Sequence, residues 1–269
     1  MSKGVRLGAL ALSATLAAPF GVRAEGPVDL ASAFERAFSG SEACVVLRDV
    51  APGAGAAVSD PQTCARRLPP CATLEVPATV IALDRGVTPD ANAPVKRNPP
   101  QEGDPPEGVN LRDASRKQVG WVFEEVARRI GPEAFTRALA AMRYGDVEAN
   151  GRPLERIDRD ADGQGLSLSP IEQVDFLARL KRGELPTSAE SQARAAEVLA
   201  TERIGDATIS WKSGACDGVA WSVGWVDRAQ RSVIFAAAMT GQQRSTEEAS
   251  ERMKRLMSDL ALIPPPQPK

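Results

Sequence analysis

The chain has 269 residues, of which 43% are hydrophobic, and a formal net charge of −2. This length allows one large domain or two small ones, and the nearly balanced charge argues against nucleic acid as a partner. Because the chain contains no histidine, Ser-His-Asp and Cys-His catalysis and every histidine-based zinc site are excluded.

The N-terminus has the pattern of a secretory signal peptide. A basic start precedes the apolar run Leu7 to Phe20, which is too short to span a bilayer, and Val22 and Ala24 occupy the cleavage positions. A retained N-terminal anchor is the alternative, and no later stretch could cross a membrane. The sequence therefore predicts a signal peptide at 1–24 and one mature domain at 25–269, located in the periplasm.

The first part of the mature chain is predicted to begin a sheet. Ala31 to Phe38 has the pattern of a short helix, and Ala43 to Asp49 is a strand rich in β-forming residues. Residues 51–60 form a Gly/Ala loop of the hairpin type. Residues 85–112 contain many prolines and few large apolar side chains, which predicts a surface loop.

Helical periodicity dominates the middle of the chain. A single helix is predicted over 114–130, because apolar residues recur on one stripe of that segment. Gly131 ends this helix. Pro132 opens the next one at its first turn, where proline is tolerated, and that helix runs to Arg143.

The last third changes from helical to strand periodicity. Ser169 and Glu172 form a capping box that starts a helix, and 189–199 is also predicted to be helical. Three strands of an antiparallel sheet follow, at Ala207–Lys212, Gly218–Asp227 and Ser232–Met239. Ser245 and Glu248 cap a final helix. Strand regions separated by a helical middle predict an α+β fold built in layers.

One segment carries the chemistry. From Pro69 onward it reads P-P-C-A-T-L-E-V-P and then A-T-V-I-A-L-D. It resembles the nucleophile helix of class D β-lactamases, which reads P-x-S-T-F-K-[IV]-P followed by an apolar I-A-L-[ED] segment. In that family the serine attacks the lactam carbonyl and the lysine takes its proton. Ala72 stands at the position of the serine and Glu75 at that of the lysine.

Framework motifs extend the resemblance over residues 33 to 262. The run at 218–227 reads G-V-A-W-S-V-G-W-V-D, the run at 169–177 reads S-P-I-E-Q-V-D-F-L, and 122–131 also fits the family pattern. The resemblance implies a β-lactamase/transpeptidase-like α+β fold, with an antiparallel sheet flanked by helices and a mostly helical subregion.

The family's site motifs are only partly present. Lys212-Ser213-Gly214 matches the K-[ST]-G strand, whose lysine and hydroxyl help to hold a β-lactam carboxylate. Tyr144 and Gly145 match two positions of Y-G-N, implying either a substrate contact or a structural turn.

Other positions of the resemblance differ. Gln118 replaces the serine of S-x-V, and the tryptophan expected near Ala161 is missing. The arginine that binds the substrate carboxylate in that family aligns loosely with Ala249. Arg252 lies about one turn away and is expected to take the place of that arginine.

The resemblance also implies a pairing for two of the four cysteines, which fit an oxidising compartment. Cys44–Cys64 is the first choice, and Cys71 and Cys216 are then free or paired across the cleft. A buried carboxylate at Glu75 needs a partner. We therefore expect Glu75 to form an ion pair with Lys212.

An acidic run downstream copies the first half of a calcium-binding loop. Asp158, Asp160 and Asp162 precede a glycine at the EF-hand spacing, but the twelfth position is Ser169 rather than glutamate. An acidic surface loop is the alternative interpretation. No metal or other cofactor is expected, although the sequence leaves calcium binding by this run open.

These patterns predict a periplasmic pseudoenzyme that keeps a penicillin-recognising cleft but forms no acyl-enzyme. Its ligand would be a β-lactam or a peptidoglycan peptide, bound non-covalently. One alternative is an active β-lactam hydrolase that uses Cys71 as nucleophile or a water activated by Glu75. Another is a peptidoglycan- or protein-binding module without an enzymatic role.

Overall fold

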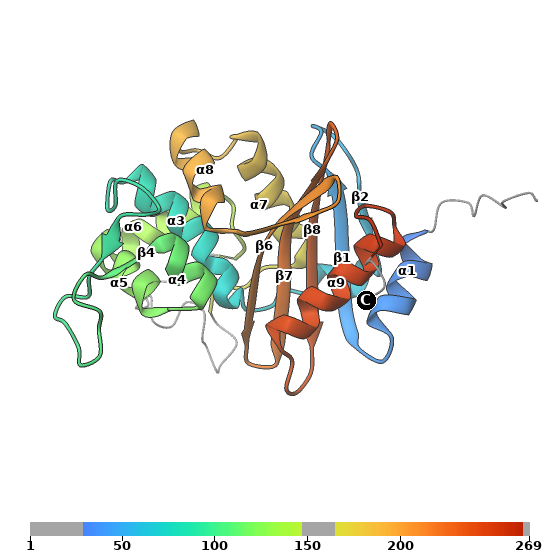
Figure 1. The fold of residues 1–269 in the computed structure, drawn as a ribbon, viewed down its shortest axis with the longest axis horizontal. Coiled ribbons are helices and arrows are strands. Elements are labelled where there is room, and N and C mark those ends of the chain that lie inside the picture. Colours follow the sequence, from blue (N-terminus) through green and yellow to red (C-terminus); the bar gives the residue numbers. More distant parts are fainter. Residues whose placement is uncertain (1–28, 147–164, 266–269) are drawn as a thin grey trace, which may run out of the picture.

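A computed structural model of the chain describes residues 29–146 and 165–265. Its centre is a six-stranded antiparallel sheet with the strand order β2-β1-β8-β7-β6-β5 (Figure 1). The strands are β1 (Glu42–Asp49), β2 (Ala56–Val58), β5 (Ala200–Ile204), β6 (Ala207–Cys216), β7 (Val219–Arg228) and β8 (Arg231–Thr240).

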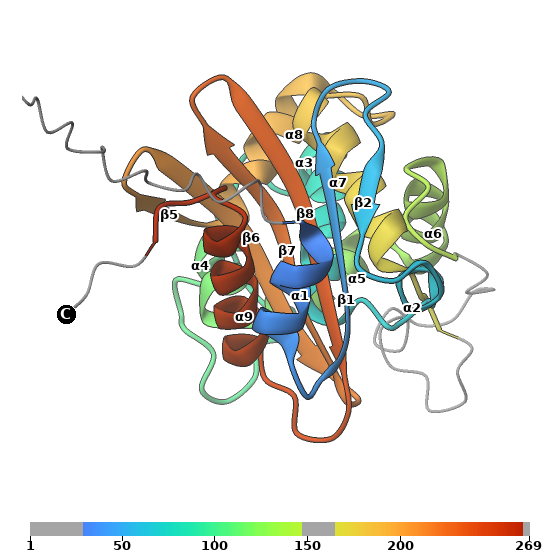
Figure 2. The same cartoon turned by 90° about the vertical axis from the view of Figure 1, so that its right-hand side faces the viewer.

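Helices cover both faces of this sheet. Figure 2 shows α1 (Leu30–Phe38) and α9 (Thr246–Asp259) side by side on one face. The opposite face carries a larger, mainly helical region (Figure 1). That region contains α2 (Pro61–Ala65), the 3-10 turn η1 (Cys71–Leu74), α3 (Glu75–Asp84), α4 (Leu111–Lys117), α5 (Trp121–Ile130), α6 (Pro132–Ala141), α7 (Pro170–Arg182), α8 (Ala189–Ala195) and η3 (Ala196–Val198). The predicted α+β architecture is confirmed.

Strand β7 shows why the central motif is apolar at almost every position. Successive side chains of a strand point to opposite faces. Trp221 and Val223 therefore enter the core under the helical region, whereas Ala220 and Val226 enter the core under α1 and α9. A strand buried on both faces needs a continuous apolar run. Trp221 also donates a hydrogen bond to the carbonyl of Pro69, at 2.8 Å, which ties the sheet to the segment that precedes η1.

The single helix predicted over 114–130 is wrong, because the structure divides it into α4 and α5. The break lies at Gln118, which adopts a left-handed conformation with φ of 56° and ends α4. The amide groups of Gln118 and Val119 both donate to the carbonyl of Ala114, which completes the helix end. Glycine or asparagine usually occupies such a position, so the periodic apolar stripe gave no sign of the break.

Two further segments differ from the prediction. Residues 85–112 are mostly loop, as expected, but they contain a small antiparallel pair formed by β3 (Pro94–Val95) and β4 (Val109–Asn110). Strand β5 was not predicted, although the helix expected at 189–199 is present as α8 and η3. Half-buried and exposed residues alternate along β5, the edge strand, and they give a weaker hydrophobic signal than those of the inner strands.

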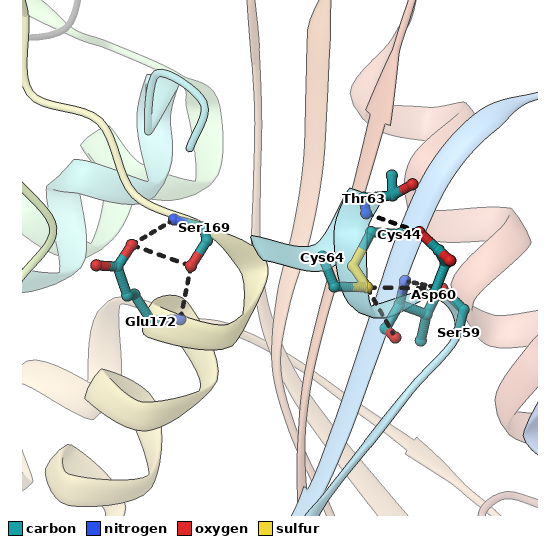
Figure 3. Close-up of a disulfide and its surroundings, with 8 residues drawn as sticks. Cys44, Ser59, Asp60, Thr63, Cys64, Ser169 and Glu172 are labelled. Atoms are coloured by element: carbon teal, nitrogen blue, oxygen red, sulfur yellow. Dashed lines mark hydrogen bonds between the residues drawn. A yellow bond between two sulfur atoms is a disulfide. The ribbon is translucent and has the colours of Figure 1, made fainter. Parts of the chain in front are cut away.

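The Cys44–Cys64 disulfide is confirmed, and it joins β1 to α2 (Figure 3). Asp60 caps α2 by accepting a hydrogen bond from the amide of Thr63, at 2.7 Å. Figure 3 also shows the predicted capping box of α7, in which Ser169 and Glu172 exchange hydrogen bonds. These caps begin α2 and α7, which both pack against β1.

Glu125 on α5 forms a buried anchor for two arginines of the same helix. Its carboxylate lies 2.7 Å from Arg128 and 2.7 Å from Arg129. Hydrogen bonds from Arg128 and then Arg129 hold the pKa of this carboxyl at about 2, well below its ordinary 4.5. Arg129 also donates to the backbone carbonyl of Lys96, so the cluster connects α5 to the β3–β4 loop.

We expect Glu125→Gln to lower the free energy of unfolding by about 1–2 kcal/mol at neutral pH, because it removes the carboxylate that pairs with both arginines. The effect stays this small because both arginines remain partly exposed to solvent. The carboxylate is stabilised in the folded state, so its contribution is complete above pH 4.5 and is lost as the pH falls toward the folded pKa. Urea unfolding from neutral pH down to about pH 3 should show the gap between wild type and variant narrowing. A gap that stays constant contradicts this assignment.

No helix among residues 29–146 and 165–265 is long and apolar enough to span a membrane. The predicted signal peptide at 1–24 and the acidic run with Asp158, Asp160 and Asp162 both lie outside the described residues. Ala161 lies outside them as well.

Candidate functional site

The turn η1 places residues 72 and 75 on one face. The amide of Glu75 donates to the carbonyl of Ala72, and this i to i+3 bond characterises a 3-10 turn. Side chains three residues apart eclipse each other in such a turn. Ala72 is half-buried and Glu75 begins α3, so the methyl group of the first and the carboxylate of the second face the same side, toward strand β6.

Glu75 and Lys212 form the predicted ion pair at the centre of the cleft. The Lys212 Nζ lies 2.6 Å from the Glu75 Oε2, and the two residues are only 4% and 7% exposed. The same Nζ donates a hydrogen bond to the Ser115 carbonyl, at 2.7 Å. Burial raises the pKa of Glu75 and the positive charge of Lys212 opposes this rise. The pair joins α3 to β6, and the bond to Ser115 adds α4.

Gly214 of the K-S-G motif is required by the close approach of η1 to β6. A Cβ atom at residue 214 would lie 2.7 Å from the backbone nitrogen of Ala72 and 3.0 Å from its methyl carbon. No side chain fits there. The Ser213 hydroxyl lies on the other side of the strand, 2.7 Å from the hydroxyl of Ser250 on α9. Lys212, Ser213 and Gly214 thus contact three different elements.

Cys71 and Cys216 form a disulfide across the cleft. It links the first residue of η1 to the last residue of β6, next to Ala72 and Ala215. The expectation for these cysteines was either free thiols or a bridge, and the structure shows the bridge. No free cysteine remains in the chain.

Two cavities lie on either side of the Glu75–Lys212 pair, and Gln118 lines both of them. The larger cavity, about 490 Å³, is bounded by η1 and α5 and includes Ala72 and Glu75 in its wall. The smaller cavity, about 300 Å³, lies between α4, β6 and α9 and includes Lys212 and Ser213. Cavities of this size accept small ligands.

Comparison with known proteins decides the family. Residues 43–258 match the family model described as the penicillin binding protein transpeptidase domain. The chain belongs to this family.

Sequence relatives within the transpeptidase family are class D β-lactamases. The chain is 28% identical to β-lactamase OXA-2 of Salmonella typhimurium over 215 residues, which covers 77% of this chain and 76% of that one. It is 30% identical to β-lactamase OXA-48 of Klebsiella pneumoniae over 180 residues, or 63% of this chain and 65% of that one. The protein is therefore class D β-lactamase-like.

Solved structures share this transpeptidase fold. The BPu1 β-lactamase superposes with a TM-score of 0.76 at 23% identity, covering 86% of this chain and 97% of that one. The class D β-lactamase YbXI from Nostoc gives 0.75 at 23% identity, covering 88% and 100%. At this level of identity, the similarity supports the fold alone.

Within the transpeptidase fold, Ser115 is a site residue that the sequence motifs missed. The expectation that Gln118 marks a lost hydroxyl has to be corrected, because Ser115 on α4 is buried beside the Glu75–Lys212 pair. The hydroxyl of Ser115 lies near Glu75 but completes no hydrogen bond within the described residues. Its spacing from Leu111 and Ala114, which form the buried face of α4, is the signal that could have located it.

Tyr144 and Gly145 line neither cavity of the cleft, so of the two expected roles, a substrate contact or a structural turn, the structure supports the structural one. Tyr144 is 0% exposed and its ring meets that of Phe176 edge-on at 4.8 Å. Burial raises the pKa of the Tyr144 hydroxyl, which lies 3.3 Å from the hydroxyl of Thr73. Tyr144 thus contacts η1 through the hydroxyl of Thr73. Gly145 is needed because a Cβ atom there would lie 2.4 Å from the carbonyl oxygen of Ser167.

Arg252 also points away from the cleft. Its guanidinium lies 3.0 Å from Glu248 on the same helix and donates to the backbone carbonyl of Ala37, at 2.9 Å, so it holds α9 to the end of α1. The expected substitution for a carboxylate-binding arginine is therefore wrong. The smaller cavity is lined by another face of α9, which carries Thr246, Glu247, Ser250, Glu251 and Lys254.

No metal site is visible in this part of the transpeptidase domain. Among the described residues, no group of three or more Cys, Asp or Glu side chains is arranged to hold a metal ion.

Proposed function

We propose that this protein is an exported pseudoenzyme that binds a β-lactam or a peptidoglycan peptide non-covalently and forms no acyl-enzyme. One observation carries the proposal: the position of the family nucleophile is the methyl group of Ala72, in the wall of a cavity of about 490 Å³. An alanine has no oxygen that could form a bond to a carbonyl carbon. Glu75 is engaged with Lys212, so it does not replace the missing base.

The alternative nucleophiles near Ala72 are unsuitable. Cys71 is bonded to Cys216, which rules out the thiol chemistry considered from the sequence. Thr73 is 0% exposed, and its hydroxyl donates to the Pro70 carbonyl at 2.6 Å, in the core beneath η1. A water activated by Glu75 would compete with Lys212 for the same carboxylate, at a residue that is only 7% exposed.

Intact-mass spectrometry with several penicillins and carbapenems tests the proposal. We expect the mass of the protein to remain unchanged after incubation, and the hydrolysis of nitrocefin to stay at the rate of buffer alone. Non-covalent binding should appear as an increase in melting temperature with ligand concentration. A covalent adduct overturns the proposal, and peptide mapping of that adduct would identify the true nucleophile, with Ser115 as the first residue to inspect.

A restored variant, Ala72→Ser with Glu75→Lys, provides the positive control. We expect slow acylation at most. Two lysines would then face each other where a neutral ion pair now lies, and no arginine of α9 reaches the cleft to hold the substrate carboxylate. The single variant Ala72→Ser should remain unacylated, because the serine would lack a lysine to take its proton.

The proposed compartment is the periplasm. Two disulfides fit an oxidising environment, in agreement with the signal peptide predicted at 1–24. N-terminal sequencing of the exported protein should give a start near Glu25. Recovery of the chain only from the cytoplasm, with its thiols reduced, would contradict this location.

A further inference from the structure

The smaller cavity has a charge pattern that an anionic ligand does not match. Arg116 projects from the α4 side, and Glu247 and Glu251 lie on the α9 side; all three line the cavity and are exposed. None of them forms an ion pair within the described part of the chain. Among the described residues, one cation without an ion pair on one wall thus faces two carboxylates without ion pairs on the other.

The two lysines that line this cavity are already neutralised. Lys212 pairs with Glu75 at 2.6 Å. Lys254 lies 2.6 Å from Glu202 and above the ring of Trp211, at 4.8 Å from the ring centroid. The Ser213 hydroxyl is engaged with Ser250. A ligand carboxylate on the α9 side would therefore meet two glutamates without an unpaired cation to balance them.

The N-terminus of α9 gives no further support to an anion. The partial positive charge of a helix N-terminus attracts carboxylates. Here Glu247 occupies the first turn, and hydrogen bonds from its own amide and from the Thr246 and Ser245 side chains lower the pKa of its carboxyl. The positively polarised N-terminus of α9 is thus already neutralised by the carboxylate of Glu247.

An unused polar group lies in the opposite wall of the cavity. Ser115 is 4% exposed, and its hydroxyl lies beside the Glu75 carboxylate without completing a hydrogen bond of good geometry within the described residues. A buried hydroxyl without a partner is costly, and Ser115 lines this cavity beside Arg116. A ligand acceptor placed toward α4 would satisfy both groups.

We propose that the smaller cavity selects a small zwitterionic peptide, with its ammonium group toward Glu247 and Glu251 and its carboxylate toward Arg116 and Ser115. The cavity volume of about 300 Å³ suits a ligand at the small end of the usual range. This inference rests on the proposed function, because it names the kind of ligand that the non-acylating cleft takes. It favours a peptide with a free amine over a singly charged β-lactam anion.

Three forms of alanylalanine test the charge selection with the full chain, by isothermal titration calorimetry. The free dipeptide is a zwitterion, its N-acetyl form is an anion, and its C-terminal amide is a cation. We expect the zwitterion to bind about fivefold more tightly than the N-acetyl form, from partly exposed ion pairs. The preference should decrease with added salt, because exposed charges are screened.

Variants then assign the two ends of the ligand. Glu247→Gln with Glu251→Gln should abolish the preference for the zwitterion over the N-acetyl form. Arg116→Gln should weaken binding of the free dipeptide but leave the amide unaffected. As a matched control, Glu102→Gln with Glu107→Gln removes two exposed carboxylates from the β3–β4 loop, which lines neither cavity of the cleft, and should preserve the preference.

The outcomes separate this inference from the proposed function. Equal or tighter binding of the N-acetyl dipeptide overturns the charge selection, as does the absence of detectable binding by any of the three forms at millimolar concentration. Neither result would indicate acylation, so the proposal of a non-acylating cleft would stand. A covalent penicillin adduct would overturn that proposal regardless of the dipeptide results.

Discussion

Replacing Lys212 with methionine is expected to lower the free energy of unfolding by about 3–5 kcal/mol, because it leaves the Glu75 carboxylate buried without its counter-charge. Both side chains are less than a tenth exposed, so solvent cannot take over the role of the lysine. Urea unfolding at neutral pH would measure the loss. The loss should shrink at lower pH, because protonated Glu75 needs no cationic partner.

Two control variants distinguish this effect from the loss of any lysine. Lys181→Met breaks a pair with Asp227 whose charged atoms lie 2.8 Å apart. Both partners of that pair are about a third exposed, so the loss of unfolding free energy should be about 1 kcal/mol or below. Replacing both members of the buried pair, by Glu75→Leu with Lys212→Met, should recover most of the stability. If Lys212→Met costs no more than Lys181→Met, the buried pair has been misassigned.

Removing the Cys71–Cys216 disulfide should have an effect of similar size. The bridge joins residues 145 apart in the sequence, and a crosslink over so long a segment is expected to contribute about 4–5 kcal/mol, mainly by restricting the unfolded chain. Cys71→Ala with Cys216→Ala, compared with wild type in urea unfolding, would measure this contribution.

The second disulfide is a control built into the same chain. Cys44 and Cys64 are only 20 residues apart, so Cys44→Ala with Cys64→Ala should cost less, about 3 kcal/mol. The reverse order of the two losses would show that local packing around β1 and α2, rather than the length of the crosslinked segment, determines the stabilisation.

Sequence reasoning located the Glu75–Lys212 pair because a charge reversal at a motif position has a simple physical consequence. A carboxylate placed next to a retained lysine in a buried cleft has to pair with it, and the structure shows this pair at 2.6 Å. Strands β1, β6, β7 and β8, the helix caps and the Cys44–Cys64 bridge were predictable for a similar reason. Each depends on residue types whose preferences are local or fixed by a close family resemblance.

Sequence reasoning failed where the direction of a side chain depends on the surrounding packing. Arg252 and Ser250 are two positions apart on α9, which turns one side chain about 200° from the other around the helix. Only Ser250 reaches the cleft. Spacing along the chain gave no means of choosing between these faces, since α9 packs between the sheet, α1 and the cavity. The left-handed conformation of Gln118 could not be predicted either, because glutamine is not a residue type typical of that conformation.

The Cys71–Cys216 bridge also limits how the two layers can move. A covalent connection between η1 and the end of β6 acts as a pivot, because the sheet and the helical region cannot separate at that point. Any opening of the cleft would therefore occur away from this bridge, on the side where α4 and α9 line the smaller cavity.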